Sequence, residues 1–171
     1  WNGIAWTATS NLYHDGTNVG ISWTTPGTYK LYVNGRLKTA GITETSDQRL
    51  KKDVMTIGNA VSKVMQLRGI KYNLKIDEYP QYDLEEGLQV GMIAQEVEKV
   101  LPEVVDTDAE GFKSIEYSHM VALLVEAIKE QQQTIEQLQS VNNSQQTRID
   151  NLTNVLIEAG MLKFEPRFLP P

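Results

Sequence analysis

The 171-residue sequence contains no cysteine, which excludes disulfide bonds and thiolate chemistry. Acidic residues outnumber basic ones, with 22 Asp and Glu and 16 Lys and Arg, so the formal net charge is -6. Because non-specific nucleic-acid binding needs clustered positive charge, we expect no nucleic-acid partner. No apolar run approaches the ~20 residues that a membrane-spanning helix needs. We therefore expect no membrane partner either.

Histidine is nearly absent as well. The two histidines, His14 and His119, are far apart in the sequence and do not have a metal-ligand spacing. Each is interpreted as an ordinary surface or packing residue. The sequence has no metal, nucleotide or organic cofactor motif, so we expect the protein to need no cofactor. Because the first residue is Trp1 and not Met, we expect the sequence to be a piece of a longer chain.

Residues 1–45 are rich in Gly, Thr, Asn and aromatic residues and predict short β-strands separated by turns. Turn signals occur at Asp15-Gly16, at Thr25-Pro26-Gly27 and at Asn34-Gly35, each flanked by β-forming residues. These strands are too short, and have too few large aliphatic side chains, to bury a core alone. The segment is therefore predicted to need partners, either neighbouring repeats or other chains. An ordinary β-hairpin subdomain is the alternative.

Residues 46–117 mix helical and strand patterns, which predicts a small α+β unit. Apolar residues recur at helical spacing from Val54 to Leu67, with Gly69 as a stop signal. A second amphipathic helix is predicted over residues 91–101 and ends at Pro102. Alternation and turn residues predict a strand at 70–76, a loop at 77–87 and a hairpin formed by 104–106 and 112–117.

From Ser118 a helical pattern with a heptad repeat runs to Gly160, which predicts a coiled coil. Amides at Gln131, Asn142 and Gln145 fall in the seam, where they fix register and strand number at some cost in stability. Ile at a with Leu at d would by itself favour two strands. The a positions are Val121, Ile128, Ile135, Asn142, Ile149 and Leu156, and the d positions are Leu124, Gln131, Leu138, Gln145, Leu152 and Ala159.

The β-rich segment and the predicted α+β unit meet at a junction with the sequence Thr45-Ser46-Asp47-Gln48-Arg49-Leu50-Lys51-Lys52. A lysine can deprotonate a serine hydroxyl without histidine, and Lys51 follows Ser46 by five residues. That offset does not place the two side chains on one face of a continuous helix, so such a dyad needs a bend. On these residues alone, Ser46 or Asp47 is more simply interpreted as the N-cap of a solvated helical turn.

Three stretches together carry a family resemblance. Ser-Asp-x-Arg-Leu-Lys at 46–51 resembles the cleavage motif of the endosialidase-type C-terminal intramolecular chaperone auto-processing domain of phage tail spikes and tail fibres. Gly-Met-Ile-Ala-Gln-Glu-Val at 91–97 and Leu-Pro-Glu-Val-Val at 101–105 are similar to further motifs of that family. The lead-in at 14–35 resembles the stalk repeat that precedes such domains, and the likeness covers about residues 10–140.

The resemblance implies an α+β chain in four parts. These are a β-rich stalk end at 1–45, the auto-processing domain at 46–117, a coiled-coil helix at 118–160 and a tail at 161–171. It implies three strands in the coiled coil, and hence a homotrimer. The chain is expected to be part of a virion tail fibre or spike precursor, made in the host cytoplasm, whose mature fibre is extracellular.

The resemblance also implies an activity. The trimer would assist folding of the upstream fibre domain of the same chain and then cut itself between Thr45 and Ser46. Ser46 would be the nucleophile and Lys51 the base, with Asp47 and Arg49 supporting the motif. The alternative is a permanent trimerisation module that is either uncut or cut and retained. A membrane-bound transcription factor of the myelin regulatory type, which carries a related domain, is disfavoured by the stalk-like lead-in and the lack of a membrane helix.

Overall fold

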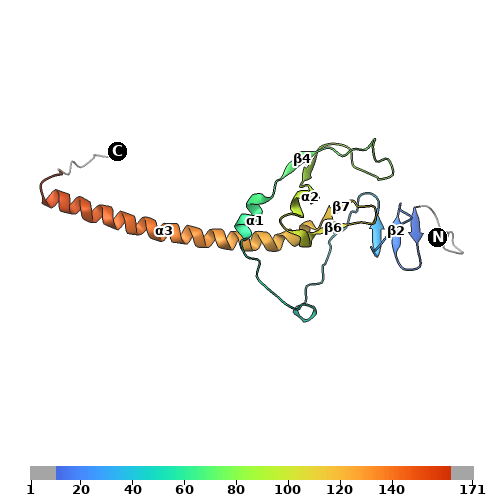
Figure 1. Ribbon diagram of the computed structural model, residues 1–171, viewed down its shortest axis with the longest axis horizontal. Helices are drawn as coiled ribbons and strands as arrows, with labels where there is room; N and C mark the ends of the chain where they lie inside the picture. The colour runs from blue at the N-terminus through green and yellow to red at the C-terminus, as the bar shows by residue number, and fades with distance from the viewer. Residues whose placement is uncertain (1–10, 163–171) are drawn as a thin grey trace.

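The computed structural model describes residues 11–162 and confirms the α+β class (Figure 1). Three short strands lie toward the N-terminal end, a small mixed body follows, and one long helix extends away from it. The elements are β1 Leu12–His14, β2 Val19–Ile21, β3 Leu31–Val33, η1 Gln48–Leu50, α1 Ala60–Gln66, β4 Ile70–Tyr72, β5 Gln89–Gly91, α2 Ala94–Val97, η2 Pro102–Val104, β6 Val105–Thr107, β7 Lys113–Ile115, η3 Tyr117–His119 and α3 Met120–Glu158, where η marks a 3₁₀ turn.

The N-terminal sheet forms where turn signals predicted strands. The Asp15 carboxylate accepts hydrogen bonds from the backbone N–H groups of Thr17 and Asn18 at 2.8 and 2.7 Å, which closes the turn between antiparallel β1 and β2. Strand β3 then pairs with β2 in parallel. Within residues 11–45 the buried positions are Asn18, Gly20 and Pro26, so no large aliphatic side chain is fully buried in this part of the chain.

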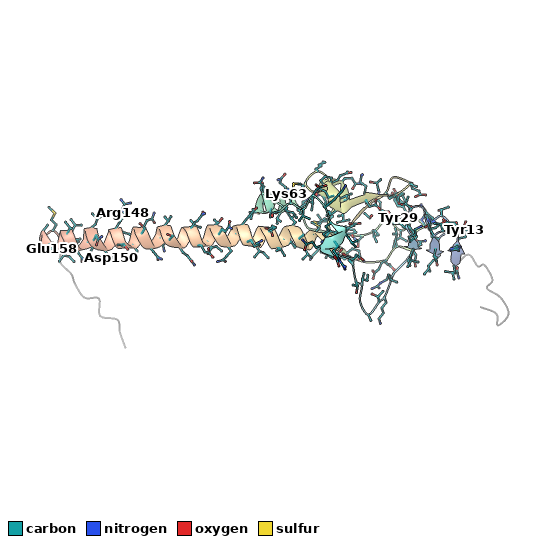
Figure 2. All side chains as sticks on the ribbon, turned by 90° about the horizontal axis from the view of Figure 1, so that it is seen from below. Tyr13, Tyr29, Lys63, Arg148, Asp150 and Glu158 are labelled. Atoms are coloured by element: carbon teal, nitrogen blue, oxygen red, sulfur yellow. The ribbon has the colours of Figure 1, made fainter. Side chains whose placement is uncertain are left out.

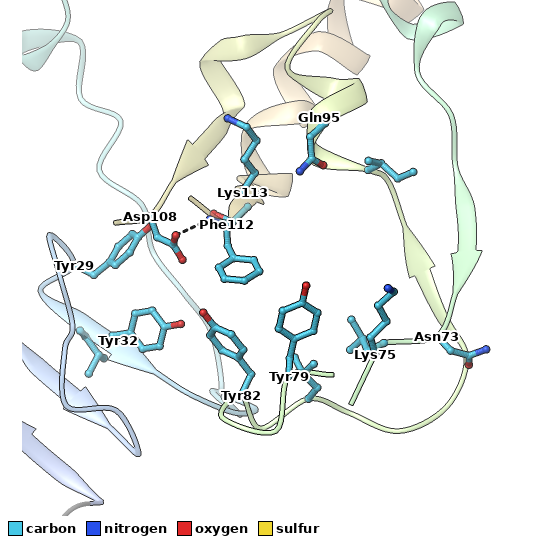
Figure 3. A pocket seen from close by; sticks show the side chains of 15 residues that line it. Tyr29, Tyr32, Asn73, Lys75, Tyr79, Tyr82, Gln95, Asp108, Phe112 and Lys113 are labelled. Atoms are coloured by element: carbon cyan, nitrogen blue, oxygen red, sulfur yellow. Dashed lines mark hydrogen bonds between the residues drawn. The ribbon is translucent and has the colours of Figure 1, made fainter. Parts of the chain in front are cut away.

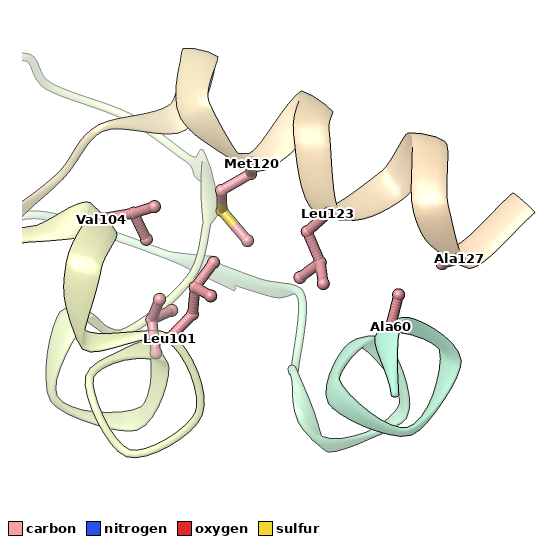
Figure 4. Packing of buried hydrophobic residues seen from close by; sticks show 7 residues of the cluster. Ala60, Leu101, Val104, Met120, Leu123 and Ala127 are labelled. Atoms are coloured by element: carbon pink, nitrogen blue, oxygen red, sulfur yellow. The ribbon is translucent and has the colours of Figure 1, made fainter. Parts of the chain in front are cut away.

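The hydrophobic core lies where the first turns of α3 cross the rest of the body. Met120, Leu123 and Ala127 recur at helical spacing and point toward Leu101, Val104 and Ala60 (Figure 4). Leu123 and Ala60 are completely buried. Partly buried side chains surround this cluster: Ile57, Val61, Val64, Leu67, Met92, Val105 and Ile115.

The helix predicted from Val54 is wrong in its first six residues, because α1 begins only at Ala60. Asn59 adopts a left-handed backbone conformation with φ of 55°, and Gly58 precedes it, so the chain enters the helix through a sharp turn. Val54 is consequently exposed rather than on a buried helical face. The predicted strand at 70–76 is paired only at Ile70–Tyr72.

The second predicted helix is also shorter than expected. Its regular part, α2, spans Ala94–Val97, and backbone turns continue to Leu101 before Pro102 starts η2. The predicted buried face is nevertheless confirmed, because Val97 and Leu101 are both buried. The hairpin of β6 and β7 is confirmed, with Val105 opposite Ile115.

Helix α3 is 39 residues long and ends where Gly160 was predicted to stop it. Gly160 has φ of 68°, and the N–H groups of Gly160 and Met161 donate to the carbonyls of Ile157 and Leu156 at 3.0 and 2.9 Å. This pattern satisfies the last carbonyls of the helix. The predicted tail at 161–171 lies outside the described residues from 163 onward. None of the helices within 11–162 has both the length and the apolar character to span a bilayer.

Among residues 11–162, no other helix or strand lies beside most of α3. Figure 2 shows the part that carries Arg148 and Asp150 extending away from the body. The predicted seam is exposed along this length, with Ile128 and Leu138 each 63% accessible and Ile149 54% accessible. A row of exposed aliphatic side chains at heptad spacing is the surface that a coiled coil buries against other helices.

We predict that Leu123→Ala destabilises the protein by about 2–5 kcal/mol, because it opens a cavity in the only part of α3 that packs on the described body. Chemical denaturation followed by circular dichroism, at matched chain concentration, measures the loss. Gln132→Ala, an exposed change on the same helix, serves as the control and should cost less than about 0.5 kcal/mol. Equal losses for the two variants would contradict this placement of the core.

Candidate functional site

The connection between β3 and α1 leaves the body beside α3, turns back at η1 and returns at α1 (Figure 1). The structure brings Ser46 and Lys51 together in this connection. The ammonium Nζ of Lys51 donates a hydrogen bond to Ser46 Oγ at 2.7 Å. The 3₁₀ turn η1 lies between them and supplies the bend that a five-residue offset requires. Ser46 and Lys51 thus form an adjacent hydroxyl and amine.

Asp47 and Arg49 brace this turn. Asp47 is the N-cap of η1, where its carboxylate Oδ1 accepts the Arg49 backbone N–H at 2.8 Å. The Arg49 guanidinium also donates to both carboxylate oxygens, at 3.0 and 2.8 Å. The Arg49 side chain and backbone N–H together lower the pKa of the Asp47 carboxyl. The Ser-Asp-x-Arg motif is thus a local clamp that closes the turn before Lys51.

Thr45, Ser46 and Lys51 are all exposed in the single chain. The same segment exposes large apolar side chains, with Leu50 73%, Val54 75% and Met55 86% accessible. A lysine acts as a base only in its uncharged form, and removal from water favours that form. The single chain therefore has the two groups in contact but does not exclude water from them.

A second feature of the chain is an aromatic cluster between the N-terminal sheet and the body. Trp23 stacks on both Tyr32 and Tyr82, with ring centroids 5.4 and 5.3 Å apart. Phe112, in the β6–β7 hairpin, contacts Tyr82 and Tyr79 edge-on at 5.4 and 5.7 Å. Tyr32, Tyr79, Tyr82 and Phe112 line an open cavity of about 930 Å³ (Figure 3), which Asp108, Lys75 and Gln95 also border.

Polar contacts also join the N-terminal segment to the body. The Tyr29 hydroxyl donates to the Asp106 carboxylate, which raises the pKa of Tyr29 to about 12. Asn34 bonds the backbone of Gln81 and Asp83, each at 3.0 Å, and Arg36 pairs with Glu85 at 2.8 Å. Residues on both sides of Thr45–Ser46 are therefore joined by contacts that do not involve that peptide bond.

Comparison with known families bears on this site, because residues 46–106 match the family model described as chaperone of endosialidase. The match begins at Ser46, the hydroxyl residue that contacts Lys51. The resemblance inferred from the sequence is thereby confirmed over these residues.

Relatives of the chain include long tail fibre proteins Gp37 of bacteriophages. The chain is 36% identical to that of Escherichia phage AR1 over 89 residues, which are 50% of this chain and 8% of the relative. It is 30% identical to that of Salmonella phage S16 over 127 residues, which are 71% of this chain and 17% of the relative. It is 34% identical to that of Enterobacteria phage K3 over 114 residues, 64% of this chain and 9% of the relative. The chain thus spans less than a fifth of these relatives.

The second motif of the chaperone-of-endosialidase segment has a packing explanation. The Tyr117 hydroxyl accepts a hydrogen bond from the Met92 backbone N–H at 3.0 Å. A Cβ at Gly91 would lie 2.8 Å from that hydroxyl, so a side chain there would push the ring away. The Gly-Met-Ile-Ala motif therefore lets β5 approach η3, just before α3 begins.

Sequence reasoning missed several residues around the junction. Ser118 Oγ donates to the Glu44 carboxylate at 2.8 Å, and His119 Nε2 lies 3.5 Å from the same carboxylate. The Glu130 carboxylate accepts the backbone N–H groups of Ala60 and Val61, both at 2.9 Å. No local pattern marks these contacts, because each joins residues 69 or more positions apart. His119, interpreted as an ordinary residue, is exposed and also pairs with Glu116 at 2.6 Å.

We predict that Arg49→Gln raises the pKa of Asp47 toward its ordinary value, because the largest cause of its lowering is the Arg49 side chain. Carboxyl NMR titration of the full chain measures this change. The pKa of Asp15 is also lowered, but by backbone N–H groups of Asn18 and Thr17, so it serves as an internal control and should not move. An unchanged Asp47 titration would contradict the clamp.

Proposed function

We propose that this chain is the trimeric intramolecular chaperone of a phage tail fibre and that it cuts its own Thr45–Ser46 bond. The observation that carries the cleavage proposal is the 2.7 Å contact between Lys51 Nζ and Ser46 Oγ. The family match at 46–106 and the tail fibre relatives support the chaperone part. They also support a place in the virion tail, with synthesis in the host cytoplasm as part of the proposal.

The chemistry follows from the geometry. Lys51 in its uncharged form takes the proton of Ser46 Oγ, and Oγ attacks the carbonyl carbon of Thr45. The carbon–nitrogen bond of the Thr45–Ser46 peptide breaks, Lys51 returns its proton to the leaving nitrogen, and an ester joins Thr45 to Ser46 Oγ. Water then hydrolyses that ester, which leaves a carboxyl group on Thr45 and restores the Ser46 hydroxyl beside the amine freed in the first step. No metal or cofactor is required for this sequence of steps.

Trimerisation would exclude water from Ser46 and Lys51, which the single chain does not do. Three copies of α3 would bury the exposed seam that includes Ile128, Leu138 and Ile149. The neighbouring chains would also lie close enough to cover the exposed apolar residues of the junction, including Leu50 and Met55. Removal of water from that segment would favour the uncharged form of a lysine there. Cleavage would then follow assembly rather than precede it.

The cleavage proposal predicts that freshly expressed full chain yields a fragment beginning at Ser46. Ser46→Ala should abolish that fragment because the nucleophile is gone, and Lys51→Ala should slow its formation by at least about 100-fold because the base is gone. Denaturing electrophoresis with intact mass follows the products. Lys52→Ala is the matched control, since it removes a neighbouring amine, and should cut within about twofold of wild type. A Ser46→Ala chain that still gives the fragment would rule out Ser46 as the nucleophile.

A cut-and-retained trimerisation module is the second candidate. It is favoured by the contacts that join the two sides of the bond, namely the Trp23–Tyr82 stack, the Asn34 hydrogen bonds and the Arg36–Glu85 pair. Native size-exclusion chromatography of the same cleaved sample separates the two candidates. Coelution of both fragments favours retention, and elution of the upstream fragment alone favours release.

The trimer proposal predicts that Leu138→Asp, made in the Ser46→Ala chain, reduces the particle from three chains to one chain of 19.3 kDa. A carboxylate at a d position would be buried among three helices without a partner. Light scattering measures the mass. Gln137→Asp adds the same charge on the exposed outer face and should stay trimeric. A wild-type chain that is already monomeric would exclude the trimer.

A further inference from the structure

The segment that contains the candidate cleavage bond is held upstream by η3, the turn that leads into the long helix, and downstream by the long helix α3 itself. Upstream, the two oxygens of the Glu44 carboxylate face Ser118 at 2.8 Å and His119 at 3.5 Å, immediately before α3. Downstream, the Glu130 carboxylate accepts the N–H groups of Ala60 and Val61, both at 2.9 Å, at the start of α1. Residues 45–59 between these two contacts are called the junction loop below.

We propose that Glu44 and Glu130 are positioning residues for the self-cleavage, which fasten the upstream end of the junction loop to η3 and its downstream end to α3 and so hold Thr45–Ser46 against Lys51. This inference rests on the proposed cleavage function. Neither residue touches the Ser46 hydroxyl or the Lys51 amine. Each acts through the backbone geometry of the loop. The long helix would then have a second task beside assembly, which is to set the shape of the cleavage segment.

The spacing of the two contacts supports this role. The anchors at His119 and Glu130 are eleven residues apart on the helix, or about 16 Å at ~1.5 Å per residue. The junction loop has 15 residues, which could extend to about 51 Å at ~3.4 Å per residue. The two anchors on the helical stretch are therefore about a third of that length apart, and the loop runs out from the body and turns back at η1 (Figure 1). Anchoring the ends removes much of the freedom that would otherwise separate Ser46 from Lys51.

The downstream contact is the stronger of the two. Glu130 is partly buried, and both of its oxygens accept backbone N–H groups that α1 cannot satisfy internally. The N–H groups of Val61 and Ala60 lower the pKa of the Glu130 carboxyl, as expected for a carboxylate whose charged form is hydrogen-bonded. Ile57 adds an apolar contact with the core at the same end.

The upstream contact is more exposed, and its groups must be considered together. Glu44 and His119 are each about half accessible, at 52% and 53%. Glu116 also faces His119, through Nδ1 at 2.6 Å, so the imidazole lies between two carboxylates. Exposed ion pairs contribute little individually, so we expect Glu44 to matter less than Glu130. It nevertheless adjoins Thr45, where a small displacement has the largest effect on an attack distance.

The test measures the first-order rate of self-cleavage in the full chain. Glu44→Gln should slow the cut about threefold and Glu130→Gln about tenfold, since misplaced reacting groups cost up to about 100-fold. The double variant should be slowed about thirtyfold, because the two contacts share no partner. His119→Lys keeps a nitrogen donor beside Glu44 and should cut within about twofold of wild type. His119→Ala removes that donor and should slow the cut by no more than Glu44→Gln does, because Ser118 still contacts the Glu44 carboxylate.

Two matched controls separate positioning from general loss of charge. Glu85→Gln breaks the 2.8 Å pair with Arg36, which also joins the upstream segment to the body but does not flank the junction loop. Glu126→Gln removes a carboxylate one turn before Glu130 on the same helix, where its partner is Lys129 at 2.8 Å. Both should cut within about 1.5-fold of wild type. Circular dichroism and light scattering check that helix content and assembly are retained in every variant.

A second measurement does not depend on self-cleavage. In the Ser46→Ala chain, limited trypsin digestion at Arg49, Lys51 and Lys52 reports opening of the junction loop. Glu44→Gln and Glu130→Gln should raise the nicking rate several-fold, and the two controls should not. If the wild type never cuts itself, the cleavage proposal fails, and the trypsin rates still decide whether the two residues hold the loop. Unchanged nicking overturns the inference, as does faster nicking with an unchanged rate of cleavage.

Discussion

The packing of the first turns of α3 is the constraint on which the rest of the structure depends. Met120, Leu123 and Ala127 face the chain's own body, and Leu123 is completely buried there. Val121, Leu124 and Ile128 lie on the adjoining face of the same turns and remain exposed. One stretch of helix therefore belongs at once to the core of the small domain and to the predicted seam. A change in the packing of this stretch would therefore alter both the core of the small domain and the predicted seam.

This arrangement links assembly to the proposed cleavage in physical terms. Pairing three β-rich chains in register is slow because the contacts are non-local, whereas a long helix forms from local contacts. Bringing three helices together would raise the effective concentration of the attached upstream segments. The loop that contains the cleavage segment is tied to the same helix at its downstream end through Glu130. A cut made only after assembly would leave a fibre that has lost its assembly helper and is kinetically trapped.

Local signals account for what could be predicted from the sequence. The Asp15-Gly16 turn, the β6–β7 hairpin and the end of α3 at Gly160 each depend on residues within a few positions of one another. The heptad repeat predicted one long helix because it too depends on residues only three or four positions apart. The family motif identified Ser46 and Lys51 as candidates, although helical periodicity alone did not favour their contact.

Long-range contacts account for what could not be predicted. The helical pattern from Val54 was misleading because Gly58 and the left-handed Asn59 break it, and because Glu130 caps the chain 70 residues away at Ala60. The Glu44 contact with Ser118 and His119 spans 74 residues to the first of them. Side chains that meet across such distances follow from the packing of α3 on the body, and neither propensity nor spacing encodes that packing.

The contacts between residues on the two sides of the Thr45–Ser46 bond also affect whether the upstream fragment would leave after a cut. In a single chain the ion pairs among them are individually weak, because Arg36, Glu85, Glu44 and His119 are all at least 41% accessible. In a trimer, three copies of the same contacts would have to open together before the upstream part could leave, which multiplies their effect. The aromatic stack of Trp23 on Tyr82 adds apolar contact to each copy. Whether a cut leads to release then depends on how the upstream fibre folds, since a rigid fibre that pulls Trp23 away from Tyr82 would break all three contacts at once.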